Sequence, residues 1–510
     1  MSKGEKTAKA TIAVTLIIFL SKAFGFVRES IIAAYFGTGM EADAYTAAYG
    51  TYYVPILLLG SCISSTLIPL YVSLRSNQGP RHANRLASNT LNLFSAFGLI
   101  VAALMFLFAG PILSVLYSGF GAEQHALTVE LLRIMLPGLG FAIAALVLSN
   151  ILNAQEHFTA AQLTGFPLSV CTIVASVFFS QTYGIRAVAW GVFATGLMQV
   201  LIQLPPLLKS FRYHWVFDPA DPMIRKMIAL AVPAILSMSA TEINSLVDKS
   251  MASGLGTGSL SAMNYAFRLV SFVQGILVVP LMTVTFSRMS RRAAGNDKGG
   301  VVKIFRESSE VICSIVLPVT IIACILSRGV IRFAFMRGEF NEHSLMLTSG
   351  VFSMYIIGEL FFGVRDLLNR VFHSMQDTKT PMYVALFMIL INILLNLLFK
   401  MLWGLNGLAL STTVSGVISC VLLMALLRRK AGHIGLKTSA PEYLKILAAS
   451  LAAGAFCLLL RSFVPEPSGF IAVFGYLALL GGSSMLVYVA AAWIFGSRNV
   501  RSLGRMFRRG

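Results

Sequence analysis

Charged residues are scarce in this sequence. Only 12% of its 510 residues are Asp, Glu, Lys or Arg, whereas 56% are hydrophobic and the mean hydropathy is +0.78. Soluble domains usually carry about 25% charged residues, so the composition excludes an ordinary soluble protein. Apolar runs of about 20 residues, each long enough to cross a bilayer as a helix, recur along the whole chain. We interpret the chain as an all-α polytopic membrane protein.

Cysteine and histidine are also few, and neither forms a metal or redox motif. The six cysteines lie in apolar segments without a CxxC pair, and the seven histidines are scattered. Cysteines in such surroundings usually act as small buried hydrophobic residues. Sequences of the types GxxxxGK[ST], HExxH and GxSxG are absent from any suitable setting. The sequence therefore gives no support to a metalloenzyme.

Acidic residues are fewer than basic ones. Asp and Glu number 21 against 40 Lys and Arg, which gives a formal net charge of +19. The basic residues gather in alternate loops, as orientation signals do, rather than as in a nucleic-acid binding protein. We therefore expect no nucleic-acid partner and place both termini in the cytoplasm. The basic segments are residues 74–85, 209–226, 288–303, 428–445 and a C-terminal tail with Arg498, Arg501, Arg505, Arg508 and Arg509.

Termini on one side require an even number of spans, and the apolar runs predict fourteen transmembrane helices. Between the ninth and tenth of them, Phe333, Phe335 and Phe340 stand among arginines, so we expect this segment to lie flat on the membrane surface. The predicted spans are residues 10–36, 42–73, 86–109, 127–153, 160–181, 185–208, 224–253, 258–289, 304–327, 343–375, 380–401, 405–428, 442–462 and 469–495.

An internal repeat divides the chain at an offset of about 220 residues. "NAQEHFTAA" at 153–161 lines up with "SMQDTKTPM" at 374–382, and "YGIRAVAWGVFATG" at 183–196 with "WGLNGLALSTTVSG" at 403–416. Spans 1–6 and 7–12 are then two copies of one six-helix unit in the same orientation, followed by two added helices. Parallel repeats of this kind build transporters whose site lies between two lobes. The predicted domains are residues 1–209, 210–430 and 431–510.

Ionisable residues stand where the spans should be most apolar. Such a group at membrane depth is costly unless it faces a cavity or a partner. Lys22, Arg28 and Glu29 fit one polar sector of the first span, and Ser261 and Arg268 share a face of the eighth. Three cations in an apolar wall suit an anion with several oxygens, such as phosphate. Three further span arginines are left without a role: Arg133, Arg365 and Arg370. Arg133 and Arg370 lie close to span ends, where snorkelling towards the surface is the alternative.

A second polar group has a different chemistry. Asp248 lies in the seventh span, Asn392 and Asn396 are four residues apart in the eleventh, and Leu408 and Thr412 are four apart in the twelfth. One carboxylate together with amide, hydroxyl and backbone oxygens could enclose a small hard cation such as Na⁺. Hydrogen-bonded helix packing is the alternative explanation. We expect no other cofactor.

Three stretches of this chain resemble a known family. "LSKAFGFVRESIIAAYFGTGMEADAY", "LLRIMLPGLGFAIAALVLSNILNAQEHF" and "FHSMQDTKTP" are similar to the MurJ (MviN) lipid II flippases, within the superfamily of drug and oligosaccharidyl-lipid exporters. The similarity covers essentially the whole chain. It implies a flippase of the bacterial cytoplasmic membrane that moves the undecaprenyl-pyrophosphate-linked peptidoglycan precursor to the outer leaflet. It also implies a central cationic cavity for the head group and a groove at the last two helices for the lipid tail.

The resemblance also assigns residues. The family's first-span basic pair falls on Lys22 and Arg28, and the acidic residue after it on Glu29. Its Asp after the FGxG turn falls on Asp43, and its eighth-span Arg and cavity Ser fall on Arg268 and Ser261. The family's sodium site falls on Asp248, Asn392, Asn396, Leu408 and Thr412.

The sequence departs from the family at three places. Lys22 replaces an Arg, which keeps the charge and loses the bidentate fork. "VPILLLGSCISS" in the second span lacks charges that are frequent there, and Asn396 stands where a second carboxylate occurs in some members.

Most other functions of a polytopic membrane protein would require different residues. An exporter of another polyprenyl-linked oligosaccharide would use the same cations, whereas a multidrug exporter of cations would favour an anionic or aromatic cavity. A membrane glycosyl- or phosphotransferase would need an acidic or histidine pair on a sizeable loop, and the loops here are short. We therefore predict a transporter rather than an enzyme, working as a monomer among bilayer lipids, driven by the membrane potential or by Na⁺.

Overall fold

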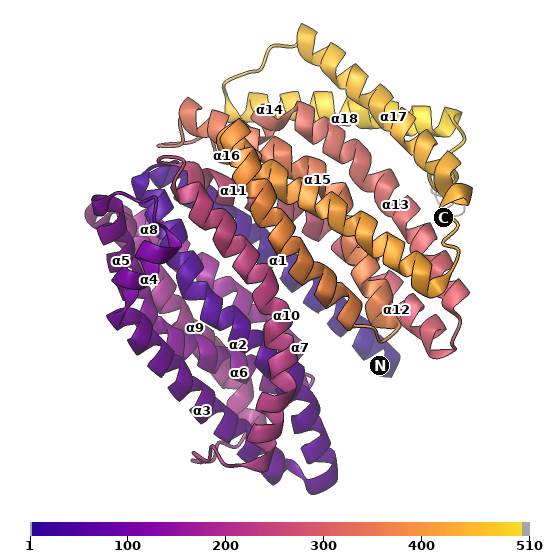
Figure 1. Cartoon of the computed structure of the whole chain (residues 1–510). Helices are drawn as coiled ribbons and strands as arrows, with labels where there is room; N and C mark the ends of the chain where they lie inside the picture. The colour runs from indigo at the N-terminus through magenta and orange to yellow at the C-terminus, as the bar shows by residue number, and fades with distance from the viewer. Residues whose placement is uncertain (1–2, 502–510) are drawn as a thin grey trace. The chain divides into compact units, whose positions relative to one another are not determined.

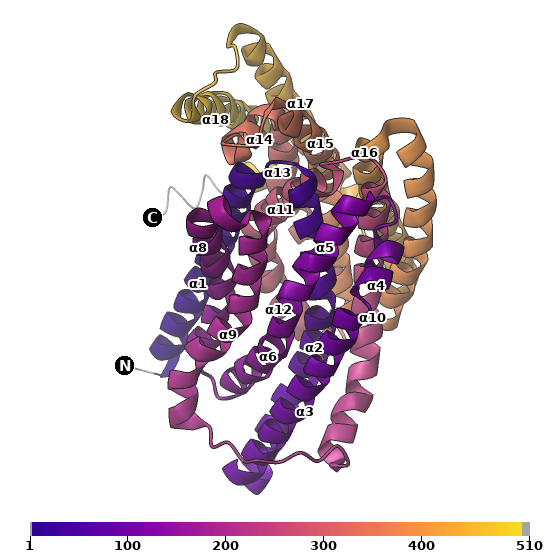
Figure 2. The same ribbon diagram turned by 90° about the vertical axis from the view of Figure 1, so that its left-hand side faces the viewer.

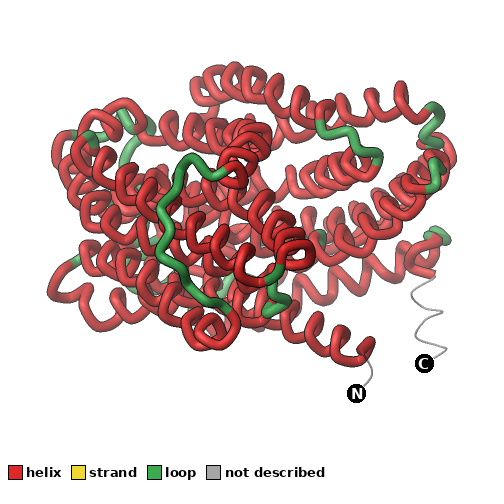
Figure 3. Tube along the Cα trace, turned by 90° about the horizontal axis from the view of Figure 1, so that it is seen from below, coloured by secondary structure: helices red, strands yellow, loops and turns green. Residues whose placement is uncertain are grey.

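The structure is a computed structural model that describes the backbone of residues 3–501 and their side chains except 3–13, 231–234, 236–241 and 436. The remaining residues, among them the predicted tail arginines Arg505, Arg508 and Arg509, lie outside the described part. Figure 3 shows that the described chain is helical and without strands. The predicted all-α class is therefore confirmed.

Each predicted span lies largely on one described helix or on two consecutive ones. The described helices are α1 (Lys3–Phe36), α2 (Met40–Gln78), α3 (Pro80–Leu107), α4 (Ala109–Leu116), α5 (Ala122–Met135), α6 (Leu139–Ala154), α7 (Phe158–Gln162), α8 (Phe166–Tyr183), α9 (Ile185–Ser210), α10 (Pro222–Ser253), α11 (Ser259–Leu277), α12 (Val279–Ala294), α13 (Lys298–Ile325), α14 (Ser327–Phe335), α15 (Glu342–Ser374), α16 (Lys379–Ala431), α17 (Leu436–Phe463) and α18 (Phe470–Ile494), with short 3₁₀ turns at Leu136–Gly138 and Leu163–Gly165. Of these helices, α4 and α14 fall between predicted spans.

Length and hydropathy qualify many of these helices as membrane spans. Among the described residues, ten helical stretches are long and apolar enough to cross a membrane, and α11 with α12 makes an eleventh if their 47° bend is counted within one span. Helix α16 has 53 residues and breaks at Gly404, so it covers the two predicted spans 380–401 and 405–428. The total of fourteen stays a prediction.

The chain forms two compact units. Unit 1 contains residues 3–261 with Arg337–Phe340, and unit 2 contains Ala262–Met336 with 341–501. Helix α10 therefore belongs to unit 1, where it packs against α2, α3 and α4. This division follows packing, whereas the predicted lobes 1–209 and 210–430 follow the sequence repeat and stay a prediction. Figure 1 shows α17 and α18 side by side within unit 2, next to α13 and α14.

The repeat is visible in the backbone. Gly184, between α8 and α9, has φ 57° and ψ −144°, and Gly404 in the middle of α16 has φ 56° and ψ −128°. Both values lie in the region that glycine reaches without steric cost. The two glycines were paired by sequence, and their matching conformations mark the same sharp turn between two helices in each copy.

The turn after α6 and the turn after α15 also match, although the sequence pairing there is displaced by one residue. Glu156 (φ 64°) and Gln376 (φ 59°) occupy the left-handed position that ends a helix in a Schellman-type turn. Glu156 therefore corresponds to Gln376 and not to Asp377. The second copy has one more residue before its next helix, since α7 begins at Phe158 and α16 at Lys379.

The segment around α14 corrects another expectation. Phe335 and Phe340 are fully buried, and the ring of Phe333 stacks on Phe470 with the centroids 4.9 Å apart. Arg332 of α14 forms an ion pair of 2.7 Å with Glu342. The prediction that this segment lies flat on the membrane surface is wrong for Phe335 and Phe340, because these two rings pack inside the protein.

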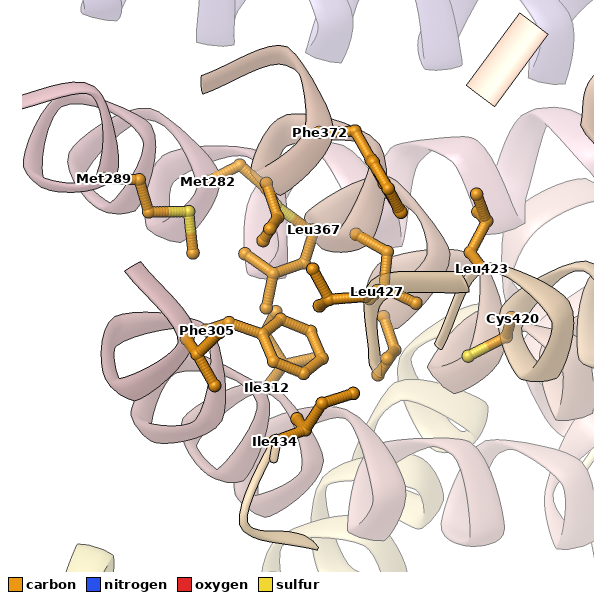
Figure 4. Close-up of a cluster of buried hydrophobic side chains, with 14 of the residues drawn as sticks. Met282, Met289, Phe305, Ile312, Leu367, Phe372, Cys420, Leu423, Leu427 and Ile434 are labelled. Carbon is orange, nitrogen blue, oxygen red and sulfur yellow. The ribbon is translucent and has the colours of Figure 1, made fainter. Parts of the chain in front are cut away.

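Unit 2 has a large apolar core where four helices meet. Figure 4 shows Met282 and Met289 of α12, Phe305 and Ile312 of α13, Leu367 and Phe372 of α15, and Cys420, Leu423 and Leu427 of α16 converging, with Ile434 below them. Each of these side chains is buried. Close packing of this kind holds the four helices as one body, since lipid surroundings give helices no hydrophobic reason to associate.

Asp377 joins the start of α16 to its end. Its carboxylate accepts hydrogen bonds from the Thr380 backbone N–H (3.0 Å) and hydroxyl (2.7 Å) and from Nζ of Lys430 (2.5 Å). Burial alone would raise the pKa of this carboxyl, but the hydrogen bonds from Lys430 and Thr380 outweigh it and lower the pKa to about 2. The ionised form is therefore favoured by folding.

This lowered pKa predicts an acid-sensitive contribution to stability. Because the folded pKa lies below the ordinary value of 3.8, the stabilisation is present above about pH 4 and is lost as the pH falls towards 2. We expect Asp377→Asn to lower the thermal unfolding temperature at pH 7 and to flatten its change between pH 4 and 2, measured in detergent by intrinsic fluorescence. Lys430→Met should reproduce part of the effect; an unchanged pH profile in both variants would contradict the assignment.

Candidate functional site

The charged residues of α1 fall into two groups. Arg28 and Glu29 are buried, with exposed fractions of 7% and 5%, and Nη2 of Arg28 lies 2.6 Å from Oε1 of Glu29. Lys22 lies six residues earlier and is exposed. Tyr45 and Tyr49 of α2 lie within electrostatic range of the Arg28 guanidinium. The predicted polar sector is thus a buried ion pair with a separate exposed cation.

The guanidinium of Arg28 keeps unused hydrogen-bonding capacity. Its Nε is buried and has no hydrogen-bond partner among the described residues. An unpaired buried donor costs roughly 1–3 kcal/mol, more for a charged group, and an ion pair between neighbours leaves the rest of the guanidinium free for another acceptor. An oxyanion that reached this point would meet a donor already in place.

Asp43 and Ser261 are brought together from distant parts of the chain. Oδ1 of Asp43 accepts from the Ser261 backbone N–H and hydroxyl, each at 2.7 Å, and Oδ2 accepts from the Gly258 N–H at 2.7 Å. Both side chains are fully buried. The carboxylate satisfies free N–H groups at the N-terminus of α11, where the helix dipole favours an anion. The predicted head-group role of these two residues stays a prediction.

We expect Asp43 to be needed for stability before any role in binding. Asp43→Asn keeps the shape but removes the charge and replaces one acceptor oxygen by a donor, so about 1–3 kcal/mol of unfolding free energy should be lost. A thermal or chaotrope unfolding series in detergent measures it.

Glu41→Gln is the matched control for Asp43→Asn, because Glu41 lies in the same helical turn and is only partly buried. It should cost less than half as much. Equal losses in the two variants would mean that the contacts of Asp43 with α11 carry no special weight.

Unit 2 presents a polar group on α11 and α15. Arg268 lies on the exposed side of α11. Further along this helix, Nε2 of Gln274 donates to Oδ2 of Asp366 at 3.4 Å, and Asp366 pairs with Arg365 at 3.2 Å. Sequence reasoning did not single out Gln274; its place six residues beyond Arg268, on a helix that also carries Asn264 and Ser271, was the available signal.

Glu359 is a buried carboxyl on the same helix as this pair. It is 1% exposed, and its Oε1 has no hydrogen-bond partner in the part of the chain that the structure describes. The three arginines left without a role all lie over rings: Arg370 over Phe286 (5.6 Å), Arg133 over Phe106 (5.3 Å) and Arg365 over Phe362 (5.2 Å). Arg133 also donates to the Phe106 carbonyl. Cation–π contact and that hydrogen bond account for Arg133 without a ligand.

Four of the five predicted sodium ligands lie together in unit 2. Nδ2 of Asn396 donates to Oδ1 of Asn392 at 2.9 Å, and Oδ1 of Asn396 accepts from the hydroxyl of Ser411. The carbonyl of Leu408 accepts from the hydroxyls of Ser411 (2.7 Å) and Thr412 (3.2 Å). Oδ1 of Asn392, Oδ1 of Asn396 and the Leu408 carbonyl therefore already accept hydrogen bonds, and a bound cation would compete with these donors.

The fifth ligand, Asp248, is buried in α10 of unit 1. No cluster of three His, Cys, Asp or Glu side chains suited to a metal occurs within the described residues. The sodium prediction stays a prediction.

The two copies of the repeat differ at these positions. Asn392 and Asn396 stand twelve and eight residues before Gly404, and Thr172 and Ser176 stand at the same distances before Gly184. All four side chains are buried. The first-copy hydroxyls donate to carbonyls of their own helix, whereas Asn396 and Asn392 bond to Ser411 and Ser415 across the turn. Only the second copy joins its two helices by amide side chains there.

An apolar cavity of 540 Å³ lies within unit 2. It is formed by α13, α15 and α17, and six of its lining residues are Leu317, Ile321, Ile357, Phe361, Ile446 and Leu447. One lining residue, Tyr443, forms a hydrogen bond of 2.6 Å between its hydroxyl and that of Ser309. A cavity with this lining suits a hydrocarbon chain and offers almost nothing to a polar ligand.

A second, smaller cavity of 160 Å³ lies in unit 1 and is partly polar. Tyr49, Tyr52 and Tyr53 of α2 line it together with Thr164 and Gln199. Tyr49 and Tyr53 are stacked, with their centroids 5.8 Å apart. The cavity has room for only a few water molecules at about 30 Å³ each, which is too little space for a lipid head group.

The fold and these features define a class: a multi-pass α-helical membrane protein with an internal repeat and charged residues inside its helices. The model of the family described as "Lipid II flippase MurJ" matches residues 32–477. This chain belongs to the MurJ lipid II flippase family.

Individual relatives agree with the family match. A "Probable lipid II flippase MurJ" of Buchnera aphidicola (strain APS) is 30% identical over 428 residues, 81% of this chain and 82% of the relative. One of Vibrio cholerae is 29% identical over 435 residues, 82% of each. A "Lipid II flippase MurJ" of Burkholderia cenocepacia is 26% identical over 451 residues, 86% of each.

Solved structures show the same fold. "Lipid II flippase MurJ, inward closed conformation" aligns with a TM-score of 0.81 and 24% identity, covering 96% of this chain and 99% of that one. An inward-facing multidrug resistance MATE family transporter of the MOP superfamily aligns with a TM-score of 0.71 and 14% identity, covering 83% and 98%. At these identities the likeness concerns architecture.

Proposed function

We propose that this chain is a flippase that moves lipid II, the undecaprenyl-pyrophosphate-linked peptidoglycan precursor, from the cytoplasmic to the outer leaflet by alternating access. The match of the flippase family model over residues 32–477 carries this proposal. The curated relatives bear the same name over four fifths or more of their lengths. Transport makes and breaks no covalent bond, so the chain acts as a transporter and not as an enzyme.

The pyrophosphate would be held by Lys22, Arg28 and Arg268. Arg28 offers a buried donor without a partner within the described chain, and Lys22 and Arg268 are exposed. Arg binds phosphate through its planar fork and Lys as a point charge. Glu29 would release part of the Arg28 guanidinium to the substrate, exchanging one charge-assisted hydrogen bond for others. Asp43 and Ser261 would position the start of α11, and with it Arg268.

The polyprenyl tail would use the apolar cavity. Its lining comes from α13, α15 and the penultimate helix α17. A 540 Å³ cavity takes part of a long lipid chain; the rest of the tail would stay among the bilayer lipids. This division explains how one protein can handle a charged head and a long hydrocarbon chain, because each part meets a matching environment.

Sodium binding by Asp248, Asn392, Asn396, Leu408 and Thr412 is a separate proposal. A cation would have to replace the hydrogen bonds that Leu408 and Asn396 accept within unit 2. The transport proposal does not depend on it, since the membrane potential supplies about 2.3 kcal/mol per charge at 100 mV.

The basic loops and the family also support a proposal about location, orientation and oligomeric state. We propose a bacterial cytoplasmic-membrane protein with both termini in the cytoplasm, active as a monomer. The multidrug reading is not favoured: Lys22, Arg28 and Arg268 would repel cationic drugs. Export of another polyprenyl-linked oligosaccharide would use the same cations, and only the family match separates it from lipid II.

Loss of the site cations should abolish transport. We expect Arg28→Ala and Arg268→Ala each to reduce lipid II translocation by more than about tenfold, because a charge-assisted contact to phosphate contributes roughly 1.5–3 kcal/mol. The measurement is translocation of labelled lipid II, with growth of a cell depleted of its own flippase as a second readout. Arg133→Ala is the control, since Arg133 bonds within the protein. Normal flipping by folded, membrane-inserted Arg28 and Arg268 variants would remove them from the site.

The sodium proposal has its own test. Asp248→Asn should abolish any dependence of transport on sodium, because the only carboxylate of the set is lost. Asp221→Asn is the matched control: this residue caps α10 through Met223 N–H at 2.8 Å, and Asn caps helices equally well. A sodium response that survives Asp248→Asn would reject the site and leave the flippase assignment untouched.

A further inference from the structure

The linker between α9 and α10 is held against the side of α3. Residues 211–221 form no helix, and Figure 2 shows them running from the foot of α9 past α3 to the start of α10. The side chain of Asn89 forms two hydrogen bonds with the Asp218 backbone. The Asp218 N–H donates to Oδ1 of Asn89 at 2.9 Å, and the Asp218 carbonyl accepts from Nδ2 of Asn89 at 2.8 Å. A side-chain amide thus pairs with the linker as a neighbouring strand would.

Two more contacts complete this attachment. Nδ2 of Asn92 donates to the Val216 carbonyl at 2.8 Å, and the His214 N–H donates to the hydroxyl of Ser88 at 3.0 Å. The bonded backbone groups belong to residues 214, 216 and 218, every second residue of an extended segment. Side chains of an extended chain alternate in direction, so the residues between them are free to point away from α3.

The intervening residues are large and aromatic. Trp215 is 82% exposed and Phe217 is 55% exposed, and Leu208 at the end of α9 is 80% exposed. Tyr213 is also exposed, although its hydroxyl bonds to Asn92. The hydrogen bonds to α3 have already removed most of the conformational freedom of this backbone. A partner that buries the outward aromatic rings therefore loses little binding free energy to ordering the linker.

The linker lies where three helices change from polar to apolar surfaces. On α3 the first exposed large apolar residue is Phe97, five residues or about 7.5 Å beyond Asn92. On α9 the exposed apolar residues end at Leu208, and on α10 they begin at Ile228. Since lipid-facing helix surfaces are apolar only within the hydrocarbon layer, the linker lies at the level where that layer ends.

Basic side chains surround the rings. Lys209, Arg212, Arg225 and Lys226 are all exposed. The two acidic residues of the segment are already engaged, because Oδ1 of Asp218 accepts from Ala220 N–H (2.9 Å) and Oδ1 of Asp221 accepts from Met223 N–H. Since these four cations outnumber the two carboxylates, the linker region carries a net positive charge.

We propose that residues 208–217 are an interfacial anchor that lies on the acidic lipid head groups of the membrane. Trp and Phe rings at the boundary of the hydrocarbon layer and cations beside them are the combination that binds an anionic bilayer surface. Because the anchor is hydrogen-bonded to α3, it fixes the start of α3, the end of α9 and the start of α10 at one membrane depth. This surface involves none of the residues assigned to lipid II.

The test is the environment of Trp215 in vesicles of phosphatidylethanolamine and phosphatidylglycerol. In a chain with Trp190→Phe, Trp403→Phe and Trp493→Phe, Trp215 is the only fluorophore of its kind. We expect stronger quenching by lipids brominated near the glycerol end of the chain than by lipids brominated near its middle, and weak quenching by aqueous acrylamide. Quenching by acrylamide with none from either lipid would place the rings in water, open to a soluble partner, and would overturn the proposal.

The charge contribution has a separate readout. Replacing phosphatidylcholine by phosphatidylglycerol should shift Trp215 emission to shorter wavelength, and Lys209→Gln and Arg212→Gln should each weaken the preference for the acidic lipid about fivefold. Arg81→Gln, on the exposed first turn of α3, is the matched control and should leave it unchanged. Equal effects of all three changes would reject a local anchor. If the triple variant fails to fold, the emission difference between the native chain and Trp215→Ser supplies the same signal.

Discussion

The structure depends on one constraint: a polar group inside a bundle of apolar helices must find its partner within the protein. Arg28 meets Glu29, Asp43 meets the open end of α11, and Asn392 and Asn396 meet Ser415 and Ser411. The contacts of Asp43, Asn392 and Asn396 also join helices that apolar packing alone would leave free to slide. Some buried side-chain atoms of the described chain have no hydrogen-bond partner, among them Nε of Arg28 and Oε1 of Glu359. These atoms are available to bond a ligand.

The two copies of the repeat show how this constraint separates scaffold from function. Both copies bend at a glycine with the same backbone conformation, Gly184 and Gly404. Thr172 and Ser176 turn their hydroxyls back to their own helix, whereas the equivalent Asn392 and Asn396 reach across the turn. The shared bend sets the helix geometry, and the longer side chains of the second copy make a polar contact that the first copy lacks.

The same apolar surroundings divide the surface between two kinds of lipid contact. The 540 Å³ cavity in unit 2 is recessed and suits a hydrocarbon chain. The linker at 208–217 is exposed, aromatic and basic, and it suits head groups. A transporter of a lipid has to hold its own position in the bilayer while its substrate moves, and separate surfaces for the two tasks make this compatible.

Much of the fold could be predicted because the helices are long, apolar and punctuated by glycine, and an apolar run of about 20 residues has few other stable structures in a membrane. The pairing of Glu156 with Asp377 failed by one residue, since a loop that is one residue longer leaves no trace in the hydrophobic pattern. The prediction that Phe335 and Phe340 lie on the membrane surface was wrong. A segment rich in aromatic and basic residues has the same sequence pattern whether its rings are buried in lipid or in protein.

The sequence by itself determined the helical class, the repeat with its turns at Gly184 and Gly404, and the set of ionisable residues that cannot face lipid unpaired. Tertiary structure alone decided which of those residues meet: Asp43 with Ser261, more than two hundred residues away, and Asn89 with the backbone of Asp218. The reason is physical. Helix formation and burial depend on local composition, whereas a hydrogen bond depends on a distance of about 3 Å between atoms that only the packed helices bring together.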